Sequence, residues 1–102
     1  MIHFNNKLYM DEACSVDPEH IRKNIVSGKT DPFTYCIVIS ANPSNLLEII
    51  NALEFRFRHY DRMKLEVVGI AGSKKSAVGL VRDIITDTFR ETGNYDVRKY
   101  FS

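Results

Sequence analysis

The sequence predicts one small α/β domain, a sandwich of roughly four to five strands with about three helices packed on its faces. Two apolar runs, FTYCIVIS at residues 33–40 and KLEVVGIA at residues 64–71, are rich in β-branched residues and lack polar alternation. This pattern is typical of strands that are buried on both faces. Because each run is followed by a segment with the apolar spacing of a helix, we expect right-handed crossovers and parallel central strands.

The first third of the chain predicts a β-hairpin and then a short helix. In IHFNNKLYM, the pair Asn5-Asn6 suits a tight turn because asparagine tolerates positive φ. In SVDPEHIRKNIVSGK, Asp17 is a candidate cap, Pro18 suits the first helical position and Gly28 supplies a stop. We therefore expect an N-terminal hairpin followed by a helix of a few turns.

Two further helices are predicted to follow the buried strands directly. In NPSNLLEIINALEFRFRHY, residues 42–60, Asn42 is a candidate cap, Pro43 fits the first turn and the apolar residues fall on one helical stripe. The clearest helical pattern covers residues 73–92 and is followed by a glycine. The ending YDVRKYF, residues 95–101, alternates in polarity and predicts a half-buried strand at a sheet edge.

Size and composition are those of one globular domain over residues 1–102. The chain has 102 residues, of which 44% are hydrophobic and 26% are charged. No signal-peptide pattern is seen, and no apolar run approaches the roughly 18–20 residues that cross a bilayer. The two cysteines, Cys14 and Cys36, form no CxxC pair. We therefore expect a cytoplasmic protein with reduced thiols and no membrane contact.

The segment GIAGSKKSA, residues 69–77, predicts a site for a small anionic ligand that carries phosphate. It matches neither the Walker A spacing nor a GxGxxG fingerprint. A turn from a buried strand into a helix still leaves backbone N–H groups unpaired beside the positive end of the helix dipole. The candidate ligand-binding residues are Gly72, Ser73, Lys74, Lys75, Ser76 and, at the other strand–helix junction, Asn42.

A structural alternative explains the same segment without a ligand. The glycines permit the turn, Ser73 caps the helix and the lysines are solvated. The second junction, SANPSN at residues 40–45, bears on the choice. If both buried strands run parallel, the two junctions share one end of the sheet, where ligands of open α/β sheets usually bind. The ligand hypothesis therefore predicts a shared cleft.

The last helix is the candidate surface for a protein partner, and a homodimer is the simplest closed assembly. Its apolar arc is wide enough for one stripe to pack on the sheet while the other contacts a helix of the same chain or a second copy. Gly79 lies inside the arc although glycine costs about 1 kcal/mol relative to alanine in a helix. The candidate interface residues are Leu80, Ile84 and Phe89.

A third function, weak nucleic-acid binding, is suggested by RFRHYDRMK at residues 56–64. Cations interleaved with aromatic side chains can hold a phosphate backbone and stack bases. The net charge of +1 argues against it, because a dedicated nucleic-acid binder needs a broader basic surface. We therefore favour a structural role, in which the aromatic side chains belong to the core and the cations end a helix.

Catalytic and metal-binding patterns are not found in the sequence. The three histidines, His3, His20 and His59, have no metal-ligand spacing. No arrangement of nucleophile, base and orienting carboxylate can be picked out without combining scattered residues. We expect a non-enzymatic protein with no metal and no cofactor.

Three segments resemble a group of short uncharacterised bacterial α/β proteins. These are NLLEIINA, VVGIAGSKKSAVGLVRDI and ETGNYDVRKYF, which lie in the C-terminal two-thirds of the chain. The resemblance implies a compact cytoplasmic domain. It supplies no catalytic residues, because no activity is assigned to that group.

Overall fold

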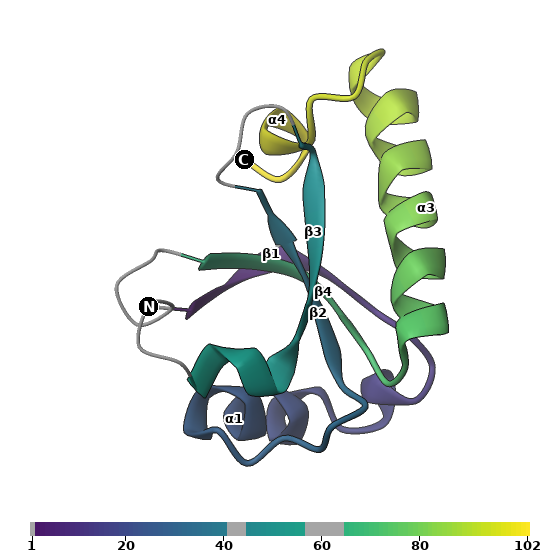
Figure 1. Ribbon diagram of the computed structural model, residues 1–102. Coiled ribbons are helices and arrows are strands. Elements are labelled where there is room, and N and C mark those ends of the chain that lie inside the picture. The colour runs from purple at the N-terminus through teal and green to yellow at the C-terminus, as the bar shows by residue number, and fades with distance from the viewer. Residues whose placement is uncertain (1, 41–44, 57–64) are drawn as a thin grey trace.

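A computed structural model of the chain describes residues 2–40, 45–56 and 65–102 and shows a four-stranded mixed sheet (Figure 1). The strands lie in the order β1-β4-β2-β3. β4 runs parallel to β1 and antiparallel to β2, and β2 runs antiparallel to β3. The strands are β1 (Ile2–Met10), β2 (Tyr35–Ile39), β3 (Leu47–Asn51) and β4 (Leu65–Ala71).

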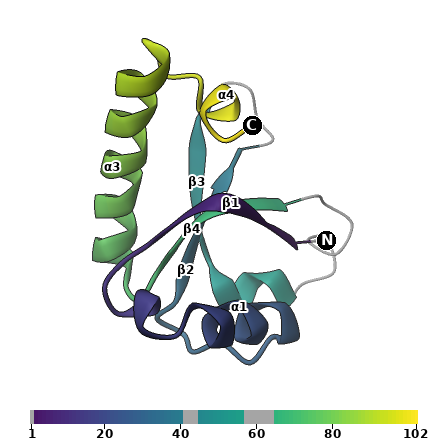
Figure 2. The ribbon, with the colours of Figure 1, turned by 180° about the vertical axis from the view of Figure 1, so that it is seen from behind.

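Helices cover both faces of this sheet, which makes the molecule a small α/β domain (Figure 2). No helix in the described ranges is both long and apolar enough to cross a membrane. One face is covered by α1 (Pro18–Ser27) with the 3-10 turns η1 (Cys14–Val16) and η2 (Ala52–Arg56), and the other by α3 (Lys74–Thr92) and α4 (Val97–Tyr100).

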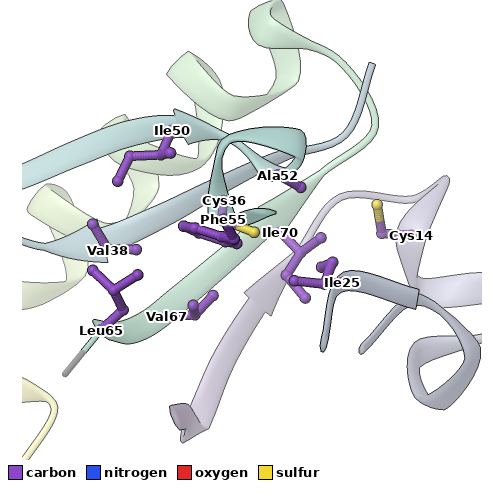
Figure 3. Close-up of a cluster of buried hydrophobic side chains, with 10 residues drawn as sticks. All are labelled: Cys14, Ile25, Cys36, Val38, Ile50, Ala52, Phe55, Leu65, Val67 and Ile70. Carbon is purple, nitrogen blue, oxygen red and sulfur yellow. The ribbon is translucent and has the colours of Figure 1, made fainter. Parts of the chain in front are cut away.

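The core is divided by the sheet into two clusters of buried side chains. Figure 3 shows the cluster on the α1 side, where ten labelled residues come from η1, α1, η2 and three strands. Ile25 of α1 and Phe55 of η2 belong to the elements that cover this face of the sheet, and both pack into the cluster. On the other face, Ile84 of α3 and Val97 of α4 are completely buried against the sheet. The two clusters account for the burial of both central strands.

β4 contributes to both clusters, and the alternation of its side chains changes phase near Val68. Val67 and Ile70 lie in the α1-side cluster, whereas Val68 and Ala71 lie in the α3-side cluster. Strict alternation would place Val67 and Ile70 on opposite faces. The register shifts at this point against both neighbouring strands, as it does at a β-bulge. Burial on both faces explains why this run shows no polar alternation in the sequence.

Four of the predicted elements are confirmed, and their ends have the expected chemistry. The buried strands appear as β2 and β4, and the helices as α1 and α3. Asp17 accepts a hydrogen bond from the His20 N–H at 3.3 Å, and Gly28 ends α1 with a φ of 74°. Ser73 Oγ accepts from the Ser76 N–H at 3.1 Å and so caps α3.

The predicted N-terminal hairpin around Asn5 is wrong, because β1 is one strand with a large bulge. Its register against β4 jumps between Phe4 and Tyr9. The Asn5 amide donates to the Phe101 carbonyl oxygen at 2.8 Å and to the Glu66 carboxylate at 3.0 Å. These contacts to distant residues hold the irregular stretch against the sheet, so the chain bulges there and does not fold back.

The predicted helix over residues 42–60 is also wrong within its described part. This part forms the strand β3 and then the turn η2. Leu47 and Ile49 pack on the α3 side and Ile50 packs on the α1 side. The run LEII at residues 47–50 therefore satisfies a strand period as well as a helical one, and β2 pairs with it along its whole length. Positions 42–44 and 57–60 of that prediction lie outside the described residues.

The expected parallel central strands are a further error, since β4 and β2 at the centre are antiparallel. The reason is the loss of the helix between them. Without a helical crossover after β2, the chain turns back as β3, and the next strand enters the sheet in the opposite direction to β2. A parallel pair remains only between β1 and β4 in the described sheet.

The predicted C-terminal strand over residues 95–101 is replaced by the short helix α4. Asp96 caps this helix by accepting from the Lys99 N–H at 3.1 Å. Val97 and Phe101 are both buried. Their spacing of four residues suits one face of a helix as well as one face of a strand. The Asp96 cap is the local signal that favours the helix.

Replacing Gly69 by alanine is expected to destabilise the protein by about 1–3 kcal/mol, because it overpacks a buried contact. A Cβ at Gly69 would lie 2.8 Å from Ile37 Cδ1 and 3.3 Å from Ile37 Cβ. The matched control is Gly79→Ala in α3, where a Cβ meets nothing within 4 Å. The control should raise the free energy of unfolding by about 0.5–1 kcal/mol. Urea unfolding measures both values, and equal effects of the two substitutions would contradict the packing role of Gly69.

Candidate functional site

The turn between β4 and α3 is occupied by a carboxylate of the same chain. The Gly72 N–H donates to Asp11 Oδ2 at 2.8 Å, and the Cys14 N–H donates to Asp11 Oδ1 at 3.0 Å. Asp11 directly follows β1, so this side chain joins the end of one strand to the end of its parallel neighbour. The turn does bind an anionic group, and that group is supplied from within the domain.

The charge of Asp11 is stabilised by the hydrogen bonds that it accepts. Burial acts to raise the pKa of this carboxyl group. Hydrogen bonds from the backbone of Gly72 and Cys14, with further ones from the Cys14 and Ser76 side chains, outweigh burial and hold the pKa below 3.8. Asp11 therefore stays ionised at neutral pH in the place where an external anion was expected.

The predicted ligand residues at this turn have mainly structural roles in the fold. Gly72 does not have a positive φ, and a Cβ there would lie 3.4 Å from Ala13 Cβ. This is an ordinary contact distance, so the role of Gly72 in the fold is the hydrogen bond from its backbone N–H to Asp11. Ser73 is the cap of α3, and Lys74 and Lys75 are exposed. Ligand binding by these residues stays a prediction.

The shared cleft with the second junction is not formed. Because β2 is antiparallel to β4, Tyr35 at the start of β2 pairs with Ala71 beside the turn. Ser40 follows the far end of β2, and its carbonyl oxygen accepts a hydrogen bond from the Arg98 guanidinium. The junction that begins at Ser40 is therefore at the opposite end of the sheet from Gly72. Asn42 itself lies outside the described residues.

The basic segment at residues 56–64 lies almost wholly outside the described residues, so nucleic-acid binding there stays a prediction. Within the ranges that are described, no group of three or more His, Cys, Asp or Glu side chains is placed to hold a metal ion.

A polar cluster that the sequence interpretation missed joins β1, α3 and α4. The Tyr9 hydroxyl lies 2.6 Å from Asp87 Oδ2 and 2.7 Å from the Tyr100 hydroxyl. Asp87 also pairs with Arg90 at 3.4 Å. Burial and the hydrogen bond to Asp87 raise the pKa of Tyr9 well above its ordinary value. Tyr9 is thus a neutral phenol that ties three elements together.

The two cysteines are both free and buried. Burial is the main cause that raises the pKa of Cys14 to about 12, and the same cause raises the pKa of Cys36 to about 12. Both side chains are therefore protonated thiols at neutral pH, and they pack as small apolar groups.

A shallow hollow of about 520 Å³ lies along β1 on the α1 side. Arg22 is the one ionisable side chain in its lining, so the hollow itself presents no acid and base together. The other lining residues are Phe4, Asn5, Asn6, Leu8, Met10, Ser15 and Pro18.

The apolar arc of α3 extends beyond the part that the sheet covers. Ile84 is completely buried and marks the line of α3 that faces the sheet. Asp87 lies on one flank of this line and contacts Tyr9 of β1, while Val81 and Ile85 lie on the other flank at 3.6 residues per turn. Because β1 and β3 are opposite edges of the sheet, the second flank faces β3.

Of the three predicted interface residues, Leu80 and Ile84 lie inside the core of the domain and Phe89 is 50% exposed. The Phe89 ring lies against Tyr95, with 5.2 Å between the ring centroids. Val78, on the flank that faces β3, is 46% exposed. The outer stripe of the helix thus remains available for a partner, whereas the inner one does not.

We call the apolar region between this flank and the sheet edge the α3–β3 surface. Its side chains belong to three elements, and all except Val78 are partly buried against the α3-side cluster. They are Ile39, Leu47, Ile49, Val78, Val81 and Ile85.

Comparison with protein-family models, with curated proteins and with solved structures found no match to this chain. The resemblance to short bacterial α/β proteins stays a prediction, and so does the cytoplasmic location. Function is therefore inferred from the geometry described above.

Replacing Asp11 by asparagine is expected to lower the free energy of unfolding at neutral pH by about 1–3 kcal/mol, because charged hydrogen bonds are lost. A folded-state pKa below the unfolded value stabilises the fold above pH 3.8, and this stabilisation is lost as the pH falls through the lower folded value. The difference between wild type and Asp11→Asn should therefore shrink in acid. Urea unfolding at neutral and acidic pH measures it.

The control for this experiment is Asp83→Asn, which changes an exposed carboxyl group on α3. It should leave the stability within about 0.5 kcal/mol of wild type. An Asp11→Asn difference that is the same at both pH values would contradict the proposed role of the ionised carboxylate.

Proposed function

We propose that this protein is a non-enzymatic interaction module that binds another protein chain on the α3–β3 surface. The observation that carries this proposal is the wide apolar arc of α3, whose outer flank is only partly covered by the described part of the domain. The outer flank leaves Val78 nearly half exposed next to the partly buried Val81 and Ile85. Contiguous apolar surface of this kind typically marks a place of association.

The sheet beside this flank extends the same apolar region. Leu47 and Ile49 of β3 point to the α3 side and are only partly buried. α3 is a single long helix on a four-stranded face, and it packs mainly on β4 and β2. The edge strand is therefore left with incomplete cover on this face among the described residues. A partner segment placed there would contact the helix flank and the strand together.

The ionisable groups with shifted pKa values support a binding role over a catalytic one. Both thiols and the Tyr9 phenol are held in their neutral forms, which are poor nucleophiles and poor bases. The ionised carboxylate of Asp11 accepts hydrogen bonds from two backbone N–H groups. Each of these groups has a structural partner or environment that explains its state.

A photo-crosslinking residue introduced at Val78, in the cells from which the gene comes, is expected to give a covalent adduct with another protein chain. The matched control is the same residue at Val26, which is 63% exposed on α1 at the other face. The mass of the adduct tells a second copy from a different protein. No adduct at Val78, or equal adducts at both positions, would contradict the proposal.

Binding of a phosphate-bearing ligand at Gly72–Ser76 is the second candidate, because this turn already holds a carboxylate. An external anion has to displace Asp11 from the Gly72 N–H, so we expect the Gly72 amide to show no saturable shift when wild type is titrated with inorganic phosphate. Asp11→Ala should allow such a shift. A saturable shift in the wild-type protein would instead favour the ligand site over the structural role of the turn.

A further inference from the structure

The two edges of the sheet differ in how they are protected from pairing. At the β1 edge the strand bulges between Phe4 and Tyr9, and Lys7 reaches the Tyr100 carbonyl oxygen and lies over the Tyr100 ring. Bulges and lysines are two of the devices that prevent edge strands from pairing with other chains. β3 contains neither, and its register with β2 is continuous over all five residues.

The backbone groups on the outer side of β3 can be assigned from its ladder with β2. The Ser40 N–H donates to the Leu46 carbonyl oxygen at 3.4 Å, and the Ala52 N–H donates to the Thr34 carbonyl oxygen at 2.9 Å. In an antiparallel ladder the direction of these groups alternates along the strand. Even-numbered residues of β3 therefore bond to β2, and the odd-numbered residues point their N–H and C=O groups away from it. These are Leu47, Ile49 and Asn51.

The one charged side chain of β3 does not protect the edge. Glu48 accepts a hydrogen bond from Ser40 Oγ at 2.6 Å, so its carboxylate is directed to the neighbouring strand. A charge protects an edge when it opposes an incoming strand, and this one is already engaged within the sheet. The outer side of β3 is thus regular, apolar on one face and bonded to no described strand.

We infer that the partner on the α3–β3 surface is a second copy of this chain, whose β3 pairs antiparallel with β3 across a two-fold axis at Ile49. This inference rests on the proposed function and names its partner. With the axis at Ile49, Ile49 faces its own copy and Leu47 faces Asn51 of the partner chain. Each residue whose backbone N–H and C=O groups point outward then lies opposite another such residue of the partner chain. If the register between the two copies were displaced by one residue, outward N–H and C=O groups would lie opposite residues whose groups bond to β2. If it were displaced by two residues, one outward-pointing residue of each strand would have no partner.

The charges and the apolar faces also fit a second copy. In this register Glu48 opposes Ile50 and does not oppose another Glu48, so no like charges meet directly. A two-fold axis perpendicular to the sheet keeps both α3 helices on the same face. Leu47 and Ile49 of the two copies then lie side by side, and the two helix flanks with Val78 face each other across them.

The surface area that a stable dimer buries is the reason that we include the apolar flank of α3 in the interface. A stable interface buries roughly 1,200–2,000 Å² in total. A strand pair of five residues is too short to supply this area by itself. The apolar flank of α3 is the adjoining surface that can make up the difference, and it lies on the correct face of the extended sheet.

The test combines sedimentation at increasing protein concentration with amide hydrogen exchange of the full chain. We expect a dimer, with protection at Leu47, Ile49 and Asn51 that rises with concentration. Glu48 and Ile50 should be protected at every concentration, because their N–H groups bond to β2 in the monomer. This alternating pattern is specific to pairing at the β3 edge.

Ile49→Pro removes an outward N–H that the ladder with β2 does not use, and proline is tolerated at such edge positions. Because the axis passes through Ile49, the substitution removes two equivalent hydrogen bonds and should raise the dissociation constant about tenfold or more. Ile49→Lys places a charge at the same edge and should act in the same direction. Val26→Lys, a matched control on α1, should leave the dissociation constant unchanged.

The outcomes separate this inference from the proposed function. A monomer at all concentrations, or a dimer without protection at the odd-numbered residues, overturns pairing at β3. If the Val78 crosslink still forms with a different protein, the interaction surface stands and only the identity of the partner was wrong. If the crosslink is also absent, both proposals fail. Should Ile49→Pro not fold, the exchange pattern of the wild-type protein still decides the question.

Discussion

The burial of β4 on both faces is the constraint on which the rest of this fold depends. Val67, Val68, Ile70 and Ala71 are all completely excluded from water. Such burial requires a strand on each side and a covering layer on each face, and β1, β2, α1 and α3 meet these needs. Side chains of β4 alternate between the two layers, with a change of phase at the bulge near Val68. α3 then follows after a connection so short that β4 also fixes where the helix starts.

Polar side chains near the N-terminus fix the outer elements to this centre. Asp11 holds the β4–α3 turn, Tyr9 reaches Asp87 of α3, and Asn5 binds the Phe101 carbonyl oxygen. Each bond joins residues more than sixty positions apart in the chain. The first strand and the last segment are thereby held against the core by hydrogen bonds as well as by apolar packing. These polar side chains are therefore engaged in holding the fold together.

Local chemistry predicted those elements whose ends carry a strong signal. Asp17 with Gly28, and Ser73 with the glycine after α3, define helices that the structure confirms. The errors lie where one apolar run suits two periods. Leu47 to Ile50 fits a helical stripe and a strand, and only pairing with β2 decides between them. That pairing is a long-range property, and the single sequence contains no local trace of it.

The candidate site was predictable only in part for the same reason. The sequence shows that the segment at Gly72 is a turn with free N–H groups, but it cannot show that Asp11, sixty-one residues earlier, fills them. The cluster around Tyr9 was missed because Asp87 has the spacing of a solvated surface charge. The apolar arc of α3 was visible, yet which stripe faces outward depends on the contact between Asp87 and Tyr9.

The asymmetry of the two edges follows from the same arrangement that forms the core. β1 lies next to the C-terminal segment, and the contacts of Asn5 and Lys7 with that segment distort its outer edge. β3 is at the opposite edge of the sheet, and it keeps a regular ladder with β2. α3 is tied toward β1 through Asp87 and so leaves its apolar flank beside β3. The contacts that protect the β1 edge therefore leave β3 without a described strand on its outer side, and this is the edge at which we propose that a second copy pairs.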